Sequence, residues 1–470
     1  MNTKRQVAQY IISDLVSTNI GWLLFNIFRY YLLPINKEIA SLSVYLSYHK
    51  IIEGQILFPV LFLCIFYLSG YYNQPFLKSR LEEFFTTLYS LLIGTLIIFF
   101  IAIINDLSYG DYGYSAFIGI FVILFACVYP CRAIITGYAT RQIHSGKWGY
   151  NTLIIGAGKN AHALAREINR QNQSPGFRLI GYIKNESDTT QNPSDDLPQF
   201  QPEYLSDIIR NKRIKRLIVA LDKNDWRSIQ KETNILYGYD LPILVSTDNY
   251  ETLFSRVKMT NILGTPLIDI TTCALSESQK NIKRLCDILF SAIALVLLLP
   301  IFLFIATSIK LTSTGNVFYK QKRVGLRRKD FTLYKFRSMI SDAENGTPTL
   351  SSENDPRITP FGKFLRKYRL DELPQFWNIL KGDMSLVGPR PERRYYVEQL
   401  LLQVPHYSLI HQLRPGLTSW GMVKYGYARN VEEMAERLKY EMLYLENISL
   451  ILDLKIIIYT IKTVFTGKGI

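Results

Sequence analysis

Cysteine is scarce in this sequence, and its spacing argues against metal or disulfide chemistry. Five cysteines occur in 470 residues, and no two of them form a Cys-x-x-Cys pair. Three lie inside long apolar blocks, where a thiol behaves as a small hydrophobic side chain. The five are Cys64, Cys127, Cys131, Cys273 and Cys286. The sequence therefore predicts neither a zinc site nor a disulfide framework.

Charged residues are almost missing from four long blocks in the first third of the chain. The blocks cover residues 10–33, 51–72, 87–104 and 116–135. Each approaches or exceeds the ~20 apolar residues that a membrane-spanning helix needs. Because they are long and nearly uncharged, we predict a four-helix transmembrane region over 1–145. The first block is too long for a cleaved signal peptide, and other blocks follow it.

Basic residues are distributed unevenly around these blocks. They lie before the first block, between the second and third, and after the fourth, whereas Asp106 and Asp111 lie between the third and fourth. The first loop is ambiguous, because it holds two lysines and two glutamates: Lys37, Lys50, Glu38 and Glu53. The basic residues are Lys4, Arg5, Lys78 and Arg80, then Arg132 at the end of the fourth block, with Arg141 and Lys147 after it. The positive-inside rule therefore predicts both ends of the bundle in the cytoplasm. Beside such apolar blocks, a net charge of +15 favours anionic lipid or phosphate-rich substrates over nucleic acid.

The middle of the chain lacks an acid that a dinucleotide-binding domain needs. Short apolar strands and a Gly-rich turn entering a helix predict an α/β Rossmann-like cytoplasmic domain over 146–275. The turn GAGKNA fits G-x-G-x-x-G/A, with Ala161 in the last place. The second strand ends in Lys184 and Asn185, and Glu186 comes one residue late to reach a ribose. We therefore expect weak or no NAD binding.

The run 288–309 contains no charged residue, and by length alone it would cross the membrane. Both of its flanks are basic, with eight basic residues against one acid in 320–337. Basic flanks favour the cytoplasmic side, and Pro300 breaks a helical hydrogen-bond ladder. We therefore expect a re-entrant helix bent at Pro300. Its freed backbone groups would be bonded by Ser291 or by a lipid-facing polar contact.

Residues 358–391 combine an acidic pair with clusters of arginine and lysine. Arg366 precedes the pair Asp371-Glu372, and Arg390 follows it. Guanidinium groups hold phosphates bidentately, a carboxylate can attack phosphorus, and a metal ion can neutralise developing charge. Most Asp-Glu pairs are solvated or cap a helix. The density of charge around this one favours phosphoryl transfer.

Two short helices are expected around the acidic pair. Thr359 and Pro360 are typical of an N-cap followed by Pro in the first turn. Asp371 is expected to be the N-cap of the second helix, which Gly382 ends. Because the helix dipole favours an ionised carboxylate there, we expect a low pKa for Asp371.

These residues resemble the bacterial polyprenyl-phosphate sugar-1-phosphate transferases. The resemblance rests on the string LDELPQFWNILKGDMSLVGPRP, and extends to KQKRVGLRRKDFTLYKFRSM upstream and RPGLTSWGMV downstream. It implies a four-helix transmembrane bundle and a Rossmann-like domain. Over 280–470 it implies a re-entrant helix, an α+β monotopic catalytic domain and a C-terminal interfacial helix. The implied reaction transfers sugar-1-phosphate from a UDP-sugar to undecaprenyl phosphate and releases UMP. This would be the first membrane step of exopolysaccharide, capsule or O-antigen synthesis, at the cytoplasmic face of the bacterial inner membrane.

The resemblance also implies roles for individual residues. Asp371 is the expected nucleophile, and Glu372 and Mg²⁺ assist it, with both carboxylates as metal ligands. The residues expected to bind substrate phosphates are Lys335, Arg337, Arg366 and Arg390. Lys335 and Arg337 would share one face of the strand in FTLYKFRSM, and Arg327 and Arg328 would face lipid. The expected partners are a UDP-sugar, undecaprenyl phosphate and the lipid bilayer, with no nucleic acid, and a homodimer stays open.

One position departs from the family pattern, and two other function classes stay open. Two residues before the acidic Asp, the family commonly has a small hydroxyl residue, and this chain has Arg369. The transferred sugar is therefore not indicated. A membrane-anchored nucleotide-sugar oxidoreductase or epimerase is disfavoured, because no tyrosine of 151–270 begins a Tyr-x-x-x-Lys pair. A non-enzymatic scaffold is the other alternative, against which the intact Asp371-Glu372 pair argues.

Overall fold

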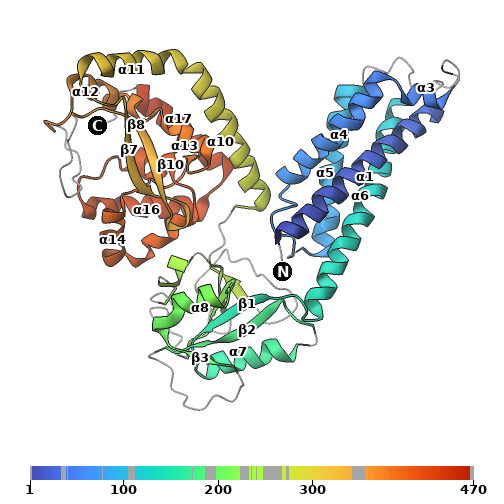
Figure 1. Cartoon of the computed structure of the whole chain (residues 1–470), viewed down its shortest axis with the longest axis horizontal. Helices are drawn as coiled ribbons and strands as arrows, with labels where there is room; N and C mark the ends of the chain where they lie inside the picture. Colours follow the sequence, from blue (N-terminus) through green and yellow to red (C-terminus); the bar gives the residue numbers. More distant parts are fainter. Residues whose placement is uncertain are drawn as a thin grey trace. The chain divides into compact units, whose positions relative to one another are not determined.

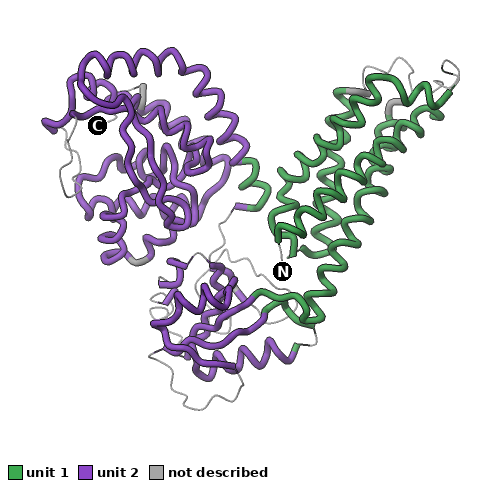
Figure 2. The backbone as a smooth tube through the Cα atoms, viewed as in Figure 1, with its two compact units in different colours: residues 1–150, 171–177, 276–282 green, residues 151–170, 178–275, 283–470 purple. Residues whose placement is uncertain are grey.

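The chain divides into two compact units (Figure 2): 1–150, 171–177 and 276–282 in one, and 151–170, 178–275 and 283–470 in the other. The structure is a computed structural model, and it describes residues 3–32, 39, 41–76, 78–103, 112–171, 173–185, 197–222, 232–233, 235–239, 241–246, 267–270, 275–340 and 355–465. The three-part division into 1–145, 146–275 and 280–470 stays a prediction.

Four long helices form the N-terminal bundle (Figure 1). They are α1 (Thr3–Leu32), α4 (His49–Leu68), α5 (Arg80–Ile98) and α6 (Tyr112–His144), with the short α3 (Leu42–Leu46) and the π-helical turn η1 (Phe99–Ile103) between them. In the described residues, these four are long and apolar enough to cross a membrane. Helix α1 packs on α4 and α6, and α5 packs on the same two. The four expected spans are confirmed, and this is a membrane protein.

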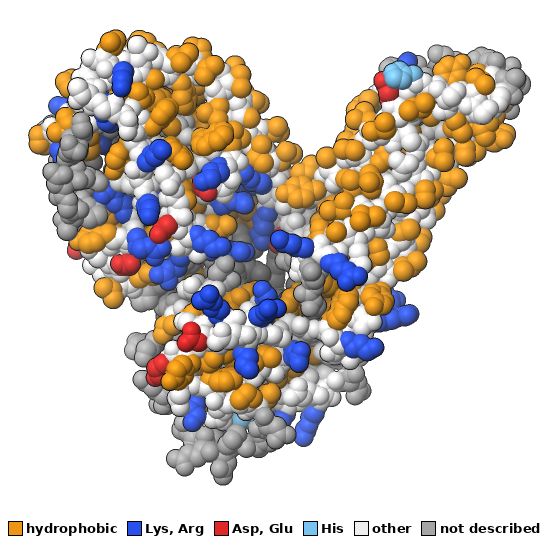
Figure 3. Space-filling model, viewed as in Figure 1, with side chains coloured by type: hydrophobic (Ala, Val, Ile, Leu, Met, Phe, Trp, Pro, Cys, Tyr) orange, Lys and Arg blue, Asp and Glu red, His pale blue; other side chains and the backbone are white. Residues whose placement is uncertain are grey.

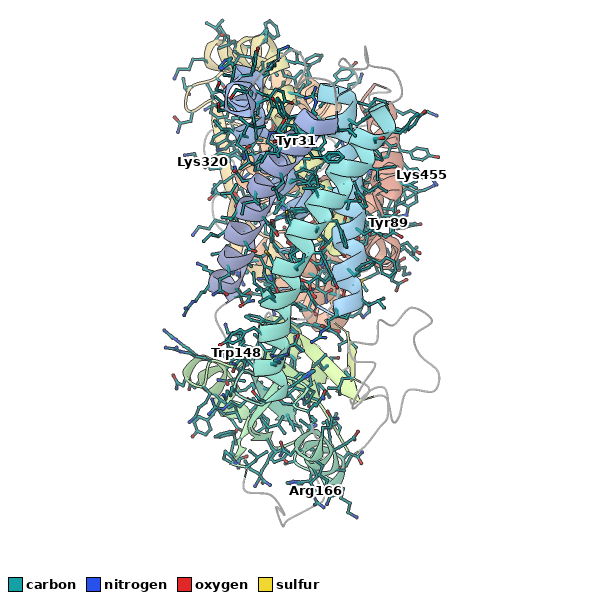
Figure 4. All side chains as sticks on the ribbon, turned by 90° about the vertical axis from the view of Figure 1, so that its right-hand side faces the viewer. Tyr31, Tyr89, Trp148, Arg166, Lys320 and Lys455 are labelled. Atoms are coloured by element: carbon teal, nitrogen blue, oxygen red, sulfur yellow. The ribbon has the colours of Figure 1, made fainter. Side chains whose placement is uncertain are left out.

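Apolar side chains cover the outside of the bundle as well as its inside. Phe62, Phe66 and Leu91 are buried at its centre, while Ile56 and Leu57 are mostly exposed. Figure 3 shows orange hydrophobic atoms along the outer faces of the helices. A helix that is apolar all round fits a lipid environment. Trp148, labelled in Figure 4, follows α6 and packs edge-on against Tyr138.

A fully buried ion pair lies inside this apolar bundle. The Arg132 Nε and Nη2 atoms each lie 2.7 Å from an Asp14 carboxylate oxygen, and neither side chain is exposed. Arg132 Nη1 also donates to Thr87 at 2.9 Å, and Tyr72 donates to Asp14 at 2.7 Å. A buried charge is tolerated only when it is paired and hydrogen-bonded, so this pair ties α1 to α6.

The middle of the chain forms a six-stranded sheet in the order β3-β2-β1-β4-β5-β6. The strands are β1 (Tyr150–Ile155), β2 (Phe177–Ile183), β3 (Gln199–Phe200), β4 (Arg216–Val219), β5 (Ile243–Ser246) and β6 (Leu267–Asp269), and the helices are α7 (Lys159–Arg170) and α8 (Leu205–Asn211), with the 3₁₀ turns η3 (Pro202–Tyr204) and η4 (Tyr237–Tyr239). β4 pairs parallel with β1 and β5, and β6 pairs antiparallel with β5. The parallel α/β domain is therefore confirmed.

The Gly-rich turn of this domain is closed by an aspartate from the end of β4. The backbone N–H groups of Lys159 and Asn160 donate to the Asp222 carboxylate at 3.0 and 2.9 Å. A Cβ atom on Gly158 would lie 2.1 Å from an oxygen of the same carboxylate. Asp222 thus occupies the helix N-terminus at which a dinucleotide pyrophosphate binds in such folds. Glu186 lies outside the described residues.

Two helices, α10 (Glu277–Leu297) and α11 (Leu299–Thr312), precede the C-terminal domain and meet at a bend of 60°. The break falls at Leu298, and Pro300 follows two residues later in the first turn of α11, where it cannot donate a hydrogen bond back into α10. The bend therefore lies beside Pro300, as expected, but one expected hydrogen-bond partner is wrong. Ser291 does not bond freed backbone groups, because its buried hydroxyl has no partner among the described residues.

The C-terminal domain combines a β-hairpin, a two-stranded parallel sheet and short helices (Figure 1). Its elements are β7 (Phe318–Val324), η6 (Leu326–Arg328), β8 (Asp330–Phe336), α12 (Pro360–Lys367), η7 (Leu370–Glu372), α13 (Gln375–Lys381), β9 (Ser385–Val387), α14 (Arg394–Gln403), η8 (Pro405–Gln412), β10 (Gly416–Thr418), α15 (Trp420–Lys424), α16 (Val431–Asn447) and α17 (Leu450–Phe465). β7 and β8 pair along their whole length. The buried side chains of Phe336 and Leu365 join the hairpin to α12.

Candidate active site

The acidic pair lies on the 3₁₀ turn η7, between α12 and α13. Thr359 caps α12 as expected, accepting the Gly362 N–H at 2.9 Å, and Gly382 ends α13 with φ 96°. The N-cap expected at Asp371 is wrong, because Pro374 holds that position in α13. The reason is local, since Arg369 adopts the left-handed conformation (φ 54°) and turns the chain into a separate 3₁₀ turn.

Glu372 is held by two cations from other elements. Lys335 on β8 places its Nζ 2.8 Å from Glu372 Oε1, and Arg390 Nη2 lies 3.8 Å from the same oxygen. Burial alone would raise the pKa of Glu372, but Lys335, Arg390 and Arg369 outweigh it and hold the pKa at about 2. Glu372 is therefore a carboxylate at every physiological pH.

Asp371 has the opposite behaviour, and the low pKa expected for it is wrong. Its side chain is buried, and burial raises its pKa to about 6, with Glu372 adding to the rise and Lys335 and Arg366 opposing it. A residue inside a buried turn loses more hydration than a helix dipole returns. A carboxylate with this pKa is mostly ionised at neutral pH, and it is more basic than an ordinary aspartate.

Of the expected phosphate-binding residues, Lys335, Arg366 and Arg390 meet at the acidic pair. Arg366 on α12 lowers the pKa of Asp371 and donates from Nε to Ser338 Oγ at 2.9 Å. Arg337 is different, because its guanidinium donates to the carbonyls of Thr314 and Ser313 at 2.6 and 2.9 Å. Arg337 therefore fastens the end of α11, and its hydrogen bonds do not reach the acidic pair.

Arg390 also lies beside a second buried cluster of charges, which is centred on Glu392. Glu392 accepts from Arg437 Nη2 at 2.6 Å and from Arg323 Nη1 at 3.2 Å, and Arg390 Nε lies 4.0 Å from it. Burial would raise the pKa of Glu392, but Arg437, Arg323 and Arg390 lower it below its usual range. Sequence reasoning missed this cluster, because nothing local distinguishes Arg437 from the solvated charges of α16.

The acidic pair also offers the ligands that Mg²⁺ prefers. Within the described ranges, no group of three or more His, Cys, Asp or Glu side chains is gathered for a metal. Mg²⁺ does not require such a group, because it commonly uses one or two carboxylates together with substrate phosphates and water. Asp371 and Glu372 therefore fit a magnesium ion that is bound jointly with a phosphorylated substrate.

Comparison with known proteins places the chain in a family. The family model described as bacterial sugar transferase matches residues 278–467, and one described as a CoA-binding domain matches residues 67–243. An uncharacterized sugar transferase of Bacillus subtilis (strain 168) is 37% identical over 189 residues, which are 40% of this chain and 90% of that protein. The chain belongs to the bacterial sugar transferase family, as its sequence resemblance implied.

Two relatives with named activities are similar over a shorter share of their length. One is a UDP-N-acetylgalactosamine-undecaprenyl-phosphate N-acetylgalactosaminephosphotransferase of Aeromonas hydrophila, 42% identical over 47% of this chain and 51% of its own length. The other is a UDP-glucose:undecaprenyl-phosphate glucose-1-phosphate transferase of Klebsiella pneumoniae, 35% identical over 56% of this chain and 58% of its own. The chain thus spans little more than half of either relative.

The match to a CoA-binding domain does not extend to the chemistry of the Gly-rich turn. CoA and NAD both present a pyrophosphate, which a Rossmann-type fold binds at the N-terminus of its first helix. Here the Asp222 carboxylate already accepts the N–H groups of Lys159 and Asn160. A second anion would be repelled by this carboxylate, so the residues present do not fit a pyrophosphate at this turn.

Proposed function

We propose that this membrane protein transfers a sugar-1-phosphate from a UDP-sugar to undecaprenyl phosphate and releases UMP. The reaction would be the first membrane step in making an exopolysaccharide, capsule or O-antigen. The observation that carries the proposal is a pair of buried carboxyl groups with different pKa values. Burial raises the pKa of Asp371 to about 6, while Glu372 stays ionised because its Oε1 atom lies 2.8 Å from Lys335 Nζ. The names of the Aeromonas and Klebsiella relatives support the same substrate classes.

The proposed chemistry has two displacement steps at one phosphorus atom. First, an oxygen of Asp371 attacks the sugar-linked phosphorus, the bond to the bridging oxygen breaks, and UMP leaves with the electron pair. Second, an oxygen of the polyprenyl phosphate attacks the same phosphorus, the bond to Asp371 breaks, and a polyprenyl diphosphate sugar is formed. Splitting the transfer avoids holding two strongly anionic substrates in the site at once.

The surrounding residues would prepare each step electrostatically. The pKa of Asp371, raised to about 6 by burial, gives a carboxylate that is mostly ionised at neutral pH and is a better nucleophile than a fully solvated one. Arg366 and Arg390 would hold the phosphates and offset the charge that builds on their oxygens. Mg²⁺, bound by both acids and the substrate, would add further positive charge.

We propose that α10 and α11 form a re-entrant hairpin in the cytoplasmic leaflet of the bacterial inner membrane. Large apolar side chains are exposed on both helices, among them Phe290, Val296 and Phe304, and the 60° bend lies between them. Helix α17 would lie in the interface, because Ile451 and Ile458 are exposed along it and Lys455 points outward (Figure 4). The catalytic domain would then face the cytoplasm.

The test is UMP release by the full chain, purified in lipid nanodiscs and given undecaprenyl phosphate, Mg²⁺ and a panel of UDP-sugars. At least one UDP-sugar should give UMP and a lipid-linked sugar product. Asp371→Asn should lose this turnover. Asp330→Asn is the matched control. Asp330 is an exposed residue of the β7–β8 hairpin, and its carboxylate lies 2.8 Å from Arg394 Nη2 of α14. UMP release by Asp371→Asn at the wild-type rate would contradict the proposal.

A further inference from the structure

One tyrosine from a distant part of the chain faces two arginines of the active site. Tyr427 lies in the loop between α15 and α16. The Arg369 Cζ atom is 5.1 Å from the centre of its ring, and the Arg390 Cζ atom is 4.9 Å from it. Both distances are within the range of an attractive cation–π contact. Tyr427 therefore brings together guanidinium groups from the two sides of the acidic pair.

Arg369 is held in this place at a conformational cost. Its φ of 54° lies in the left-handed region, which a side chain with a Cβ atom adopts at a cost of roughly 1–2 kcal/mol. Backbone strain of this kind persists only where the surrounding structure imposes it. In the described part of the chain, its Nε is buried without a hydrogen-bond partner. The position thus carries a charged side chain whose Nε donor is not used by the described part of the fold.

An aromatic ring, unlike a carboxylate, can hold a guanidinium group without using its N–H donors. A carboxylate binds a guanidinium through its N–H donors, whereas a ring attracts it through the π face and leaves the N–H edge available. The two carboxylates that form ion pairs with the Arg390 guanidinium, Glu372 and Glu392, lie 3.8 and 4.0 Å from it, beyond hydrogen-bond distance. Both arginines can therefore present N–H donors to an incoming anion.

The phenol itself does not neutralise the two cations. Burial raises the pKa of Tyr427, and the nearby Glu372 raises it further, against the opposing effect of Arg369 and Arg390. The ring is therefore a neutral phenol across the physiological pH range. The ring supplies a surface for two guanidinium groups, and their positive charge remains available to a ligand.

We propose that Arg369 is a further phosphate-binding residue of this active site, and that Tyr427 is the positioning residue that holds it together with Arg390. The proposal rests on the proposed function, since the ligand would be a phosphate of the nucleotide diphosphate or of the polyprenyl phosphate. Two guanidinium groups fixed on one ring suit a phosphate, because each can bind two of its oxygens.

The first experiment varies the two substrates separately in the UMP-release assay. Arg369→Gln and Tyr427→Leu should each raise the KM for one phosphate substrate by about tenfold or more, with a smaller change in kcat. Tyr427→Phe keeps the ring and should stay within about twofold of wild type. The double variant Arg369→Gln/Tyr427→Leu should raise the KM by less than the product of the two single effects, because both changes act on one phosphate site.

Tyr425→Leu is the matched control, because Tyr425 lies two residues away, is exposed, and packs towards Tyr440. It should leave both KM values unchanged. A rise in the KM for the UDP-sugar identifies the nucleotide diphosphate as the ligand, and a rise for undecaprenyl phosphate identifies the lipid phosphate. Unchanged KM values in Arg369→Gln, or equal losses in Tyr427→Phe and Tyr427→Leu, would overturn the proposal.

A binding measurement without turnover separates this proposal from the proposed function. Inorganic pyrophosphate is titrated into the full chain, and the rise in unfolding temperature is compared between wild type and Arg369→Gln. The rise should be smaller in the variant and normal in Tyr425→Leu, even if no UDP-sugar releases UMP. Equal rises in wild type and Arg369→Gln, or none in either, would overturn the phosphate site.

Discussion

Removing the Lys335 ammonium should move the acid limb of the pH–activity profile to higher pH. Lys335 lies 2.8 Å from Glu372 Oε1 and is the strongest of the charges that lower the pKa of Asp371. We therefore consider Lys335→Met, which keeps most of the side-chain volume and removes the charge. The ammonium stabilises the ionised form of Asp371, and the Glu372 carboxylate destabilises it. Without the ammonium, the pKa of Asp371 must therefore rise.

The size of the shift follows from the geometry. An opposite charge within about 4–6 Å typically lowers a carboxyl pKa by about 1–3 units, at about 1.4 kcal/mol per unit. In the wild type, the nucleophile is ionised above a pKa of about 6, so activity should fall as the pH drops through that value. In Lys335→Met the midpoint of this acid limb should move up by about 1–3 units. The variant should be weak at pH 7 and recover partly in alkaline buffer.

The assay is single-turnover UMP release at saturating UDP-sugar, measured between pH 5 and pH 9. Lys381→Met serves as the control, because Lys381 is exposed and pairs only with Asp383 at 3.3 Å in the described residues. Its acid limb should coincide with that of the wild type. The reasoning is refuted if Lys335→Met loses activity but keeps the wild-type midpoint, because Lys335 would then act without tuning the acidic pair.

Three further predictions concern the other parts of the chain. Asp14→Asn should destabilise the bundle by roughly 3–5 kcal/mol in chemical unfolding, because it leaves Arg132 buried and unpaired, and Arg132→Met in the same chain should restore part of the loss. Wild-type protein should show no micromolar NAD or CoA binding by calorimetry, and tight NAD binding would contradict the conclusion that Asp222 occupies the pyrophosphate position. Asp222→Ala should lower the free energy of unfolding by about 1 kcal/mol, because the helix cap is lost. In a chain without other reactive cysteines, Lys280→Cys and Lys310→Cys should both react with an impermeant thiol reagent only from the cytoplasmic side, and opposite sidedness would mean that α10 and α11 cross the membrane.

Local patterns in the sequence predicted the elements well. The four apolar blocks, the strands around the Gly-rich turn, the Thr359 cap and the Gly382 helix end each depend on neighbouring residues alone. Such features follow from side-chain polarity, capping hydrogen bonds and the left-handed freedom of glycine. The expected meeting of Lys335 with the acidic pair was also accessible, because strand alternation and the family resemblance pointed to the same residue.

Features that depend on tertiary burial could not be predicted from the sequence. The raised pKa of Asp371 comes first from burial, which no stretch of sequence encodes by itself. Arg437 looks like a surface charge of an amphipathic helix, yet it is buried against Glu392. Tyr427 comes 58 positions after Arg369 in the numbering, and only the folded chain brings its ring to that guanidinium. The hydrogen bonds of Arg337 to the carbonyls of Thr314 and Ser313 also depend on the fold, and its expected role in binding substrate stays a prediction.

The most direct test of the proposed mechanism is to trap the covalent intermediate on Asp371. Wild-type protein is mixed with the UDP-sugar identified in the panel and Mg²⁺, without undecaprenyl phosphate, and is quenched in acid. The two-step mechanism predicts a burst of up to one equivalent of UMP per chain, and a phosphosugar adduct that mass spectrometry places on the peptide containing Asp371. Asp371→Asn should give neither. An unmodified protein whose UMP release requires both substrates together would contradict the covalent mechanism.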